Sequence, residues 1–314
     1  MFESIEEVQS ACAKGEYITD RALATTLYLA HNLNKPIFLE GEPGVGKTEV
    51  AKVLATITDG KLIRLQCYEG LDAYSALYEW NYAKQILQLR IDEAQRIEKD
   101  QIGANLFSED FLLKRPLLDA IQSDGDVAPV LLIDEVDRSD SEFEAFLLEI
   151  LSDFQITIPE IGTIRAKHIP YVVLTSNRTR EVHEALKRRC LYQWIDYPSL
   201  QKELSIVKTK IPNIDHRLAQ QLCSMMQIWR EGDYYKKPGI AETLDWGLAL
   251  IALGKDTLDP EIVDETLGCL FKYQDDVQRA QGADLHEFVA RAKRLADSSS
   301  HGEPEKTEWV YSQG

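Results

Sequence analysis

The sequence predicts an α/β fold: a parallel β-sheet core followed by a smaller all-α domain. In the first two thirds of the chain, short apolar runs typical of buried strands alternate with segments of helical periodicity. After Pro198, apolar residues recur only at helical spacing. A chain of 314 residues is long enough for one large and one small domain. We expect domains at 1–197 and 198–297, and a polar, flexible tail at 298–314.

The expected elements follow in order along the chain. Two helices are expected within 5–33, separated at Gly15-Glu16, and a third from Glu49 to Thr56. The apolar runs predict strands at 36–40, 62–67, 130–133 and 171–174. Between them, the pattern predicts a mostly helical stretch at 72–126, helices at 141–153 and 179–187, and a hairpin of 155–158 with 159–165 that turns at Gly162. The second domain shows helical spacing through 200–230, 241–253 and 260–296.

Composition and charge argue against several classes of protein. Acidic residues outnumber basic ones 52 to 35, which gives a net charge of −17 and argues against extended binding to nucleic-acid phosphates. No run approaches 18 apolar residues, and the acidic start lacks the features of a secretory signal. The five cysteines are scattered and form no CxxC pair, which is typical of reduced thiols and not of a zinc site. We therefore expect a soluble, cytoplasmic protein without a membrane segment.

The motif GEPGVGKT at 41–48 matches the phosphate-binding pattern GxxxxGK[ST]. Its glycines allow backbone N–H groups to turn inward around an anion, and the following helix directs its positive end to the same place. Lysine and threonine at the last two positions suit phosphate oxygens and Mg²⁺. The alternative is a plain glycine turn, but the apolar strand before it and the apolar helix after it favour nucleotide binding. The predicted phosphate-binding residues are Gly41, Glu42, Pro43, Gly44, Val45, Gly46, Lys47, Thr48 and Glu49.

A second motif, VLLIDE, ends a predicted strand in two carboxylates. Asp134 would lie beside the glycine loop and hold Mg²⁺ together with Thr48, while Glu135 would activate the attacking water. Taken alone, the motif could be an ordinary strand that ends in an acidic turn. Its position 86 residues after Thr48 favours the catalytic interpretation. ATP and Mg²⁺ are the cofactors that these two motifs predict.

Two later features are ambiguous by themselves. Asn177 follows a predicted strand, where its amide could bind the lytic water or the γ-phosphate, or could cap the helix expected at 179–187. Arg188 and Arg189 end that helix, where they could neutralise a phosphoryl-transfer transition state or could be surface residues favoured by the helix dipole.

The order of these four features resembles that of AAA+ ATPases, a class of P-loop NTPase, and the helical domain resembles the AAA+ lid. Within that superfamily, GEPGVGKTEVAKVLA and LLIDEVDRSDSEFEAFLLEILSDFQITIP resemble the MoxR group, over roughly residues 15–255. The segments LDAYSALYEWNYAKQILQLR and PGIAETLDW are similar to the subgroup associated with aerobic carbon monoxide dehydrogenase and related molybdenum hydroxylases.

The resemblance implies a homo-oligomeric ring, usually a hexamer, with ATP at the subunit interfaces. Asn177 would be sensor 1, and Arg189, in preference to Arg188, would act on the neighbouring subunit's ATP. The segments 68–115 and 155–165 would be inserts facing the pore or upper surface. A von Willebrand factor A domain protein would be the partner, and a metalloenzyme the client of this chaperone. The stretch 238–246 has no arginine, so we assign no sensor 2.

Other interpretations remain at this point. The protein could be a nucleotide-gated scaffold with little hydrolysis, or a DNA-acting AAA+ motor, which the net charge opposes. An aromatic and basic set could stack on single-stranded bases, although partner contact or core packing fits so acidic a chain better. This set consists of Tyr74, Tyr78, Trp80, Tyr82, Lys84 and Arg90. We expect none of the six histidines to bind a metal.

Overall fold

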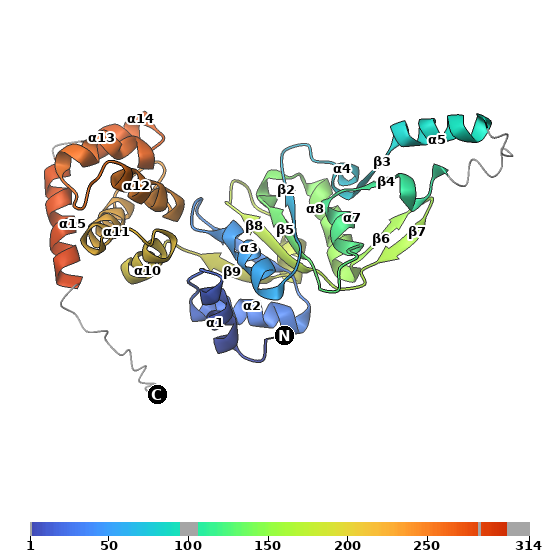
Figure 1. The fold of residues 1–314 in the computed structure, drawn as a ribbon, viewed down its shortest axis with the longest axis horizontal. Helices are drawn as coiled ribbons and strands as arrows, with labels where there is room; N and C mark the ends of the chain where they lie inside the picture. Colours follow the sequence, from blue (N-terminus) through green and yellow to red (C-terminus); the bar gives the residue numbers. More distant parts are fainter. Residues whose placement is uncertain (1, 95–105, 282–283, 300–314) are drawn as a thin grey trace. The chain divides into compact units, whose positions relative to one another are not determined.

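The computed structural model describes residues 2–94, 106–281 and 284–299 (Figure 1). The chain divides into two compact units, Met1–Asp196 and Tyr197–Gly314. None of the described helices has the length and apolar character needed to span a bilayer. The tail expected at 298–314 lies outside the described residues from residue 300 onward, while the last helix continues to Ser299.

The first unit is built on a five-stranded parallel sheet with the order β2-β5-β8-β1-β9. Its strands are β1 (Ile37–Gly41), β2 (Leu62–Gln66), β5 (Val130–Asp134), β8 (Tyr171–Ser176) and β9 (Leu191–Ile195). The three inner strands are almost fully buried, as expected for a parallel sheet covered on both faces. Strand β2 is an edge strand in which exposed and buried residues alternate. The predicted parallel α/β core is confirmed.

Helices pack against this sheet on both sides (Figure 1). They are α2 (Arg21–Leu33), α3 (Lys47–Thr58), α7 (Pro116–Ile121), α8 (Ser141–Asp153) and α9 (Glu184–Arg189), while α1 (Ile5–Lys14) packs against α2 and α3. One core brings alternate strand residues such as Leu131 and Ile133 together with Phe143 and Leu147 of α8. The helix predicted at 179–187 is wrong in its start, because α9 begins at Glu184 and is capped by the side chain of His183.

Over its described residues, the stretch 72–126 is less helical than its sequence predicts. It contains α4 (Ala73–Leu77), β3 (Tyr78–Trp80), α5 (Tyr82–Ala94), a 3₁₀ turn η1 (Glu109–Phe111), β4 (Leu112–Lys114) and α7. Strands β3 and β4 form an antiparallel pair that the periodicity could not reveal, since each strand is only three residues long. The predicted hairpin is present as β6 (Gln155–Ile158) and β7 (Gly162–Arg165), and Gly162 has a φ of 103° that favours glycine.

The second unit is helical throughout its described residues. It contains α10 (Leu200–Lys210), α11 (His216–Glu231), α12 (Ile240–Ala252), α13 (Pro260–Leu270), α14 (Gln274–Gln281) and α15 (Leu285–Ser299). Trp229 and Trp246 lie at its centre with ring centroids 5.4 Å apart, and the indole N–H of Trp246 donates to Thr266 Oγ1 at 2.8 Å. Both tryptophans are therefore core aromatics.

A buried ion pair crosses the core of this unit. Arg230 donates to both carboxylate oxygens of Glu203, at 2.6 and 2.7 Å, and also to the carbonyl oxygen of Pro238. The hydroxyl of Thr243 donates to the same carboxylate at 2.7 Å. Arg230 is thus committed to packing α10, α11 and α12 together.

Candidate functional site

The glycine loop joins β1 to α3 in a conformation that requires its glycines. Gly44 and Gly46 have φ values of 79° and 94°, which L side chains rarely adopt. At Gly41, a Cβ would lie 2.1 Å from the carbonyl oxygen of Ile195 on β9, so any side chain would displace the neighbouring strand. The loop ends at Lys47, the first residue of α3. The helix therefore directs its N-terminal N–H groups into the loop, where an anion would be stabilised.

Lys47 is a buried cation, with 7 % of its surface exposed. Its Nζ donates to the carbonyl oxygens of Gly41 and Glu42 at 2.7 and 2.8 Å. Burial lowers the pKa of Lys47 to about 8, although nearby carboxylates, Asp137 foremost, oppose that shift. A negatively charged ligand in the loop would stabilise the ammonium that burial penalises.

Asp134 ends β5 directly beside the loop. One carboxylate oxygen accepts hydrogen bonds from Thr48 Oγ1 at 3.1 Å and from Thr175 Oγ1 at 2.5 Å. The other oxygen pairs with Arg64 Nη2 on β2 at 2.5 Å. A hydroxyl and a carboxylate in contact provide the oxygen donors that Mg²⁺ prefers, so Thr48 and Asp134 fit such an ion.

Glu135 follows in the left-handed region, with a φ of 55°. One of its carboxylate oxygens accepts from Asn177 Nδ2 at 3.3 Å, and the other accepts from Gln66 Nε2 at 3.0 Å and Arg138 Nη1 at 3.2 Å. The capping alternative for Asn177 is wrong, because α9 starts seven residues later. Instead, the structure brings Asn177 and Glu135 together from two neighbouring strands, β8 and β5.

A third carboxylate, Asp137, also lies in the site and was not predicted from the sequence. It is buried and accepts from the backbone N–H groups of Asn177 and Thr179, at 3.2 and 2.8 Å, and from the Thr179 hydroxyl at 2.7 Å. It therefore fastens the segment after β8, which carries Asn177, to the segment after β5. A third carboxylate within four residues, in IDEVD, was the available signal.

Arg64 and Gln66 were also missed. They alternate with the buried Ile63 and Leu65 on β2, so both point to the same face of this edge strand. Polar residues at alternate positions of LIRLQ were the available signal, but sequence alone could not tell that side chains on this exposed face reach Asp134 and Glu135.

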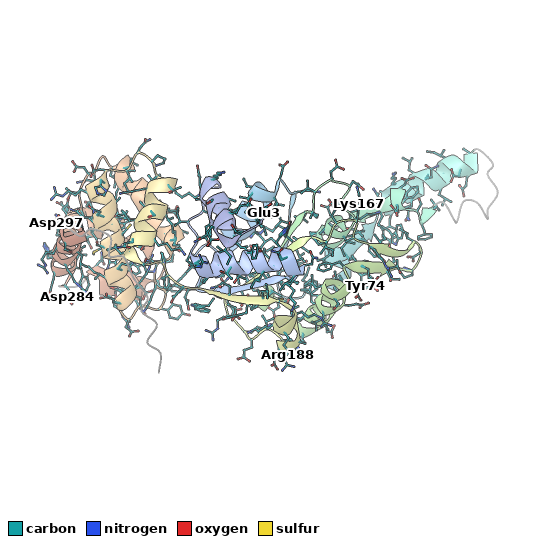
Figure 2. All side chains as sticks on the ribbon, turned by 90° about the horizontal axis from the view of Figure 1, so that it is seen from below. Glu3, Tyr74, Lys167, Arg188, Asp284 and Asp297 are labelled. Atoms are coloured by element: carbon teal, nitrogen blue, oxygen red, sulfur yellow. The ribbon has the colours of Figure 1, made fainter. Side chains whose placement is uncertain are left out.

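The two arginines at the end of α9 differ in their partners. Arg188 pairs with Glu184 at 2.6 Å on the surface of the unit (Figure 2). Arg189 is exposed and forms no ion pair within the described part of the chain. Neither arginine contacts the loop, Asp134 or Glu135 in this single chain, judged over the described residues.

The aromatic and basic set is partly packed against the core and partly exposed, and Tyr74 contacts Tyr78 edge to face. Tyr78 and Trp80 pack edge to face at 6.0 Å and lie against the core, and Lys84 lies over the ring of Phe111. Tyr74 and Tyr82 remain largely exposed. No group of three or more His, Cys, Asp or Glu side chains is placed to hold a metal ion in 2–94, 106–281 or 284–299.

The site lies in a segment of the chain that is similar to a known family. Residues 36–190 match the AAA domain of the dynein-related subfamily. The matched segment is therefore similar to an AAA domain. It begins just before β1 and ends just after Arg189, so it contains the glycine loop, both strand-end carboxylates, Asn177 and the arginine pair.

Two solved structures are similar to the chain over most of its length. A candidate ATPase from Cytophaga hutchinsonii is 16% identical, with 93% of each chain covered and a TM-score of 0.46. RuvB from Thermotoga maritima, a Holliday junction branch migration motor, is 17% identical, with 85% of this chain and 72% of that chain covered and a TM-score of 0.44.

Proposed function

We propose that the AAA domain binds ATP with Mg²⁺ and hydrolyses it. The observation that carries this proposal is the convergence of five side chains at the carboxyl edge of the sheet, Lys47, Thr48, Asp134, Glu135 and Asn177. Each has the chemistry that one part of phosphoryl transfer to water requires, and hydrogen bonds link four of them in two pairs.

Each residue has a distinct task in this proposal. The loop N–H groups hold the phosphates, and Lys47 exchanges two carbonyl partners for phosphate oxygens. Thr48 and Asp134 hold Mg²⁺, which when bound neutralises charge on the β- and γ-phosphate oxygens. Glu135 accepts the proton of the attacking water, while Asn177 fixes one oxygen of that carboxylate through its Nδ2.

We further propose that the active form is a ring, with a hexamer as the expected state, in which Arg189 completes the neighbouring subunit's site. Its exposure and lack of a carboxylate partner among the described residues support this role. Arg188 is less suited, because it is held by Glu184. Residues 1–197 would be the nucleotide-binding core and 198–297 the lid.

The biological role that we propose rests on the resemblance to the MoxR group. The ring would act in the cytoplasm as a chaperone, together with a von Willebrand factor A domain protein. Its client would be a metalloenzyme, with the molybdenum hydroxylases related to aerobic carbon monoxide dehydrogenase as the first to test.

Steady-state ATP hydrolysis against protein concentration tests the catalytic proposal. Turnover per subunit should rise with concentration, because half of each site comes from a neighbour. Glu135→Gln and Arg189→Ala should bind ATP normally but lose at least about 100-fold in turnover. Arg188→Ala is the matched control and should retain most of the activity. Turnover that is flat across the dilution range would refute the role of Arg189 in a neighbouring site.

One observation favours a second candidate, a nucleotide-gated scaffold. The stretch 238–246 of the helical unit has no arginine that could sense phosphate, and the nearby Arg230 is buried in its pair with Glu203. A protein whose helical unit does not respond to the bound phosphate could bind ATP yet hydrolyse it very slowly. If ATP binds but the wild type is no faster than Glu135→Gln, the scaffold is the correct function.

A further inference from the structure

The strongest unassigned feature of the site is the ion pair between Arg64 and Asp134. In the sheet, Arg64 is aligned with Leu132 and Gln66 with Asp134, so Arg64 reaches its partner diagonally across two parallel strands. Its Nη2 lies 2.5 Å from Asp134 Oδ2 and 2.6 Å from Gln66 Oε1. The guanidinium is therefore held between a carboxylate and an amide oxygen.

The two members of this pair differ in their surroundings. The Asp134 side chain is 4% exposed, whereas that of Arg64 is 54% exposed. Asp134 cannot leave, because Thr48 and Thr175 also hold it. Arg64 lies on an edge strand and can swing into solvent at little cost. If one partner is to be displaced when a cation arrives, it is the arginine.

We propose that Arg64 competes with Mg²⁺ for Asp134 and so sets the concentration of Mg²⁺ at which the metal–nucleotide complex forms. The inference rests on the proposed function. A divalent ion on the Thr48 side of Asp134 would lie a few ångströms from the guanidinium. Even with the screening of bulk water, a double and a single positive charge a few ångströms apart repel by an amount equivalent to about tenfold in the binding constant. Arg64 is thus a positioning residue that keeps Asp134 neutralised until metal and nucleotide arrive together.

The test measures binding in the full-length chain without turnover. A fluorescent ADP analogue is bound at increasing Mg²⁺, and the Mg²⁺ midpoint of the affinity increase is compared among variants. Arg64→Gln should lower that midpoint about tenfold, while Arg64→Lys, which keeps the charge, should stay close to the wild type. Lys61→Gln is the matched control: Lys61 precedes the same strand, is similarly exposed and pairs with Asp119, at the other end of β2.

The direction in which Arg64→Gln shifts the Mg²⁺ midpoint shows whether Arg64 competes with Mg²⁺ or only holds Asp134 in place. If Arg64 only held Asp134 in shape, Arg64→Gln would raise the Mg²⁺ midpoint, which would overturn the inference. A midpoint equal to that of Lys61→Gln, or a Lys variant that behaves like Gln, would also overturn it. If the wild type binds no nucleotide at any Mg²⁺ concentration, the proposed function fails and the inference with it. Normal binding by the wild type with an unshifted midpoint in Arg64→Gln refutes the inference alone.

Discussion

Raising the pH above about 8 should weaken nucleotide binding, because Lys47 then loses its proton in the free protein. Burial lowers the pKa of Lys47 from 10.5 to about 8. Phosphates beside the ammonium would favour its charged form and raise that pKa again. If binding restored the ordinary value, affinity would gain a factor of a few hundred, on the order of 3 kcal/mol.

The assay is the binding of a fluorescent ADP analogue to the wild type and to Lys47→Arg across this pH range. Wild-type affinity should be level below about pH 8 and fall by up to tenfold per unit above it. Lys47→Arg should show no such fall, because a guanidinium keeps its proton. Equal slopes for both proteins, or a level wild-type curve, would refute the reasoning.

Unfolding does not explain such a loss of affinity. The unfolded chain binds the Lys47 proton with an ordinary pKa of 10.5, and the folded chain binds it with a pKa of about 8. The destabilising effect of the buried charge is therefore complete below about pH 8 and is relieved as the pH rises toward 10.5. The Lys47 contribution to the stability of the free protein rises over the window in which its affinity for nucleotide falls.

Three further changes test other contacts. Arg230→Met should lower the free energy of unfolding by about 3–5 kcal/mol in chemical denaturation, because Glu203 is left as an unpaired buried charge; a loss no larger than that of an exposed pair would contradict this. Thr175→Val removes a donor to Asp134 and an acceptor for the Glu135 N–H, so it should slow ATP hydrolysis about 10- to 100-fold and lower the free energy of unfolding by about 1–3 kcal/mol; unaltered turnover would count against it. Asp137→Asn should cost about 1–3 kcal/mol of unfolding free energy, since it weakens the acceptor for the backbone after β8, and an unchanged stability would show that the charge is not needed there.

The centre of the sheet was predictable because its inner strands are buried on both faces. A run such as Val130–Ile133 has no polar position, so it marks a central parallel strand without knowledge of its partners. The pair β3 and β4 was not predictable, since three residues are too few to show a period. Its partners, Tyr78–Trp80 and Leu112–Lys114, are also more than thirty residues apart in the sequence. Only packing against the core brings them together.

The candidate site also has a part that the sequence predicts and a part that it does not. The glycine loop was predictable because its backbone conformation requires glycines at fixed positions of one short motif. The carboxylates at the end of β5 were predictable because they directly follow an apolar run. The contacts made by Gln66 and Asn177 to Glu135 depend on strand order, which places β5 between β2 and β8. A sequence can mark each strand end as polar, but it does not say which two strands flank the third.

Three carboxylates within four residues would repel one another without compensation, and the structure compensates them in two different ways. Asp137 is bound largely by backbone N–H groups after β8, which cannot move unless the strand moves. Asp134 and Glu135 are bound mainly through side chains, including Arg64 and Gln66 of the edge strand, and side chains can exchange partners by rotation. The backbone N–H donors, which are fixed in place, therefore bind Asp137, the carboxylate that holds the segments after β5 and β8 together. The exchangeable ones go to the two carboxylates to which we assign metal binding and catalysis, so these can take up a metal ion and a water without unfolding their surroundings.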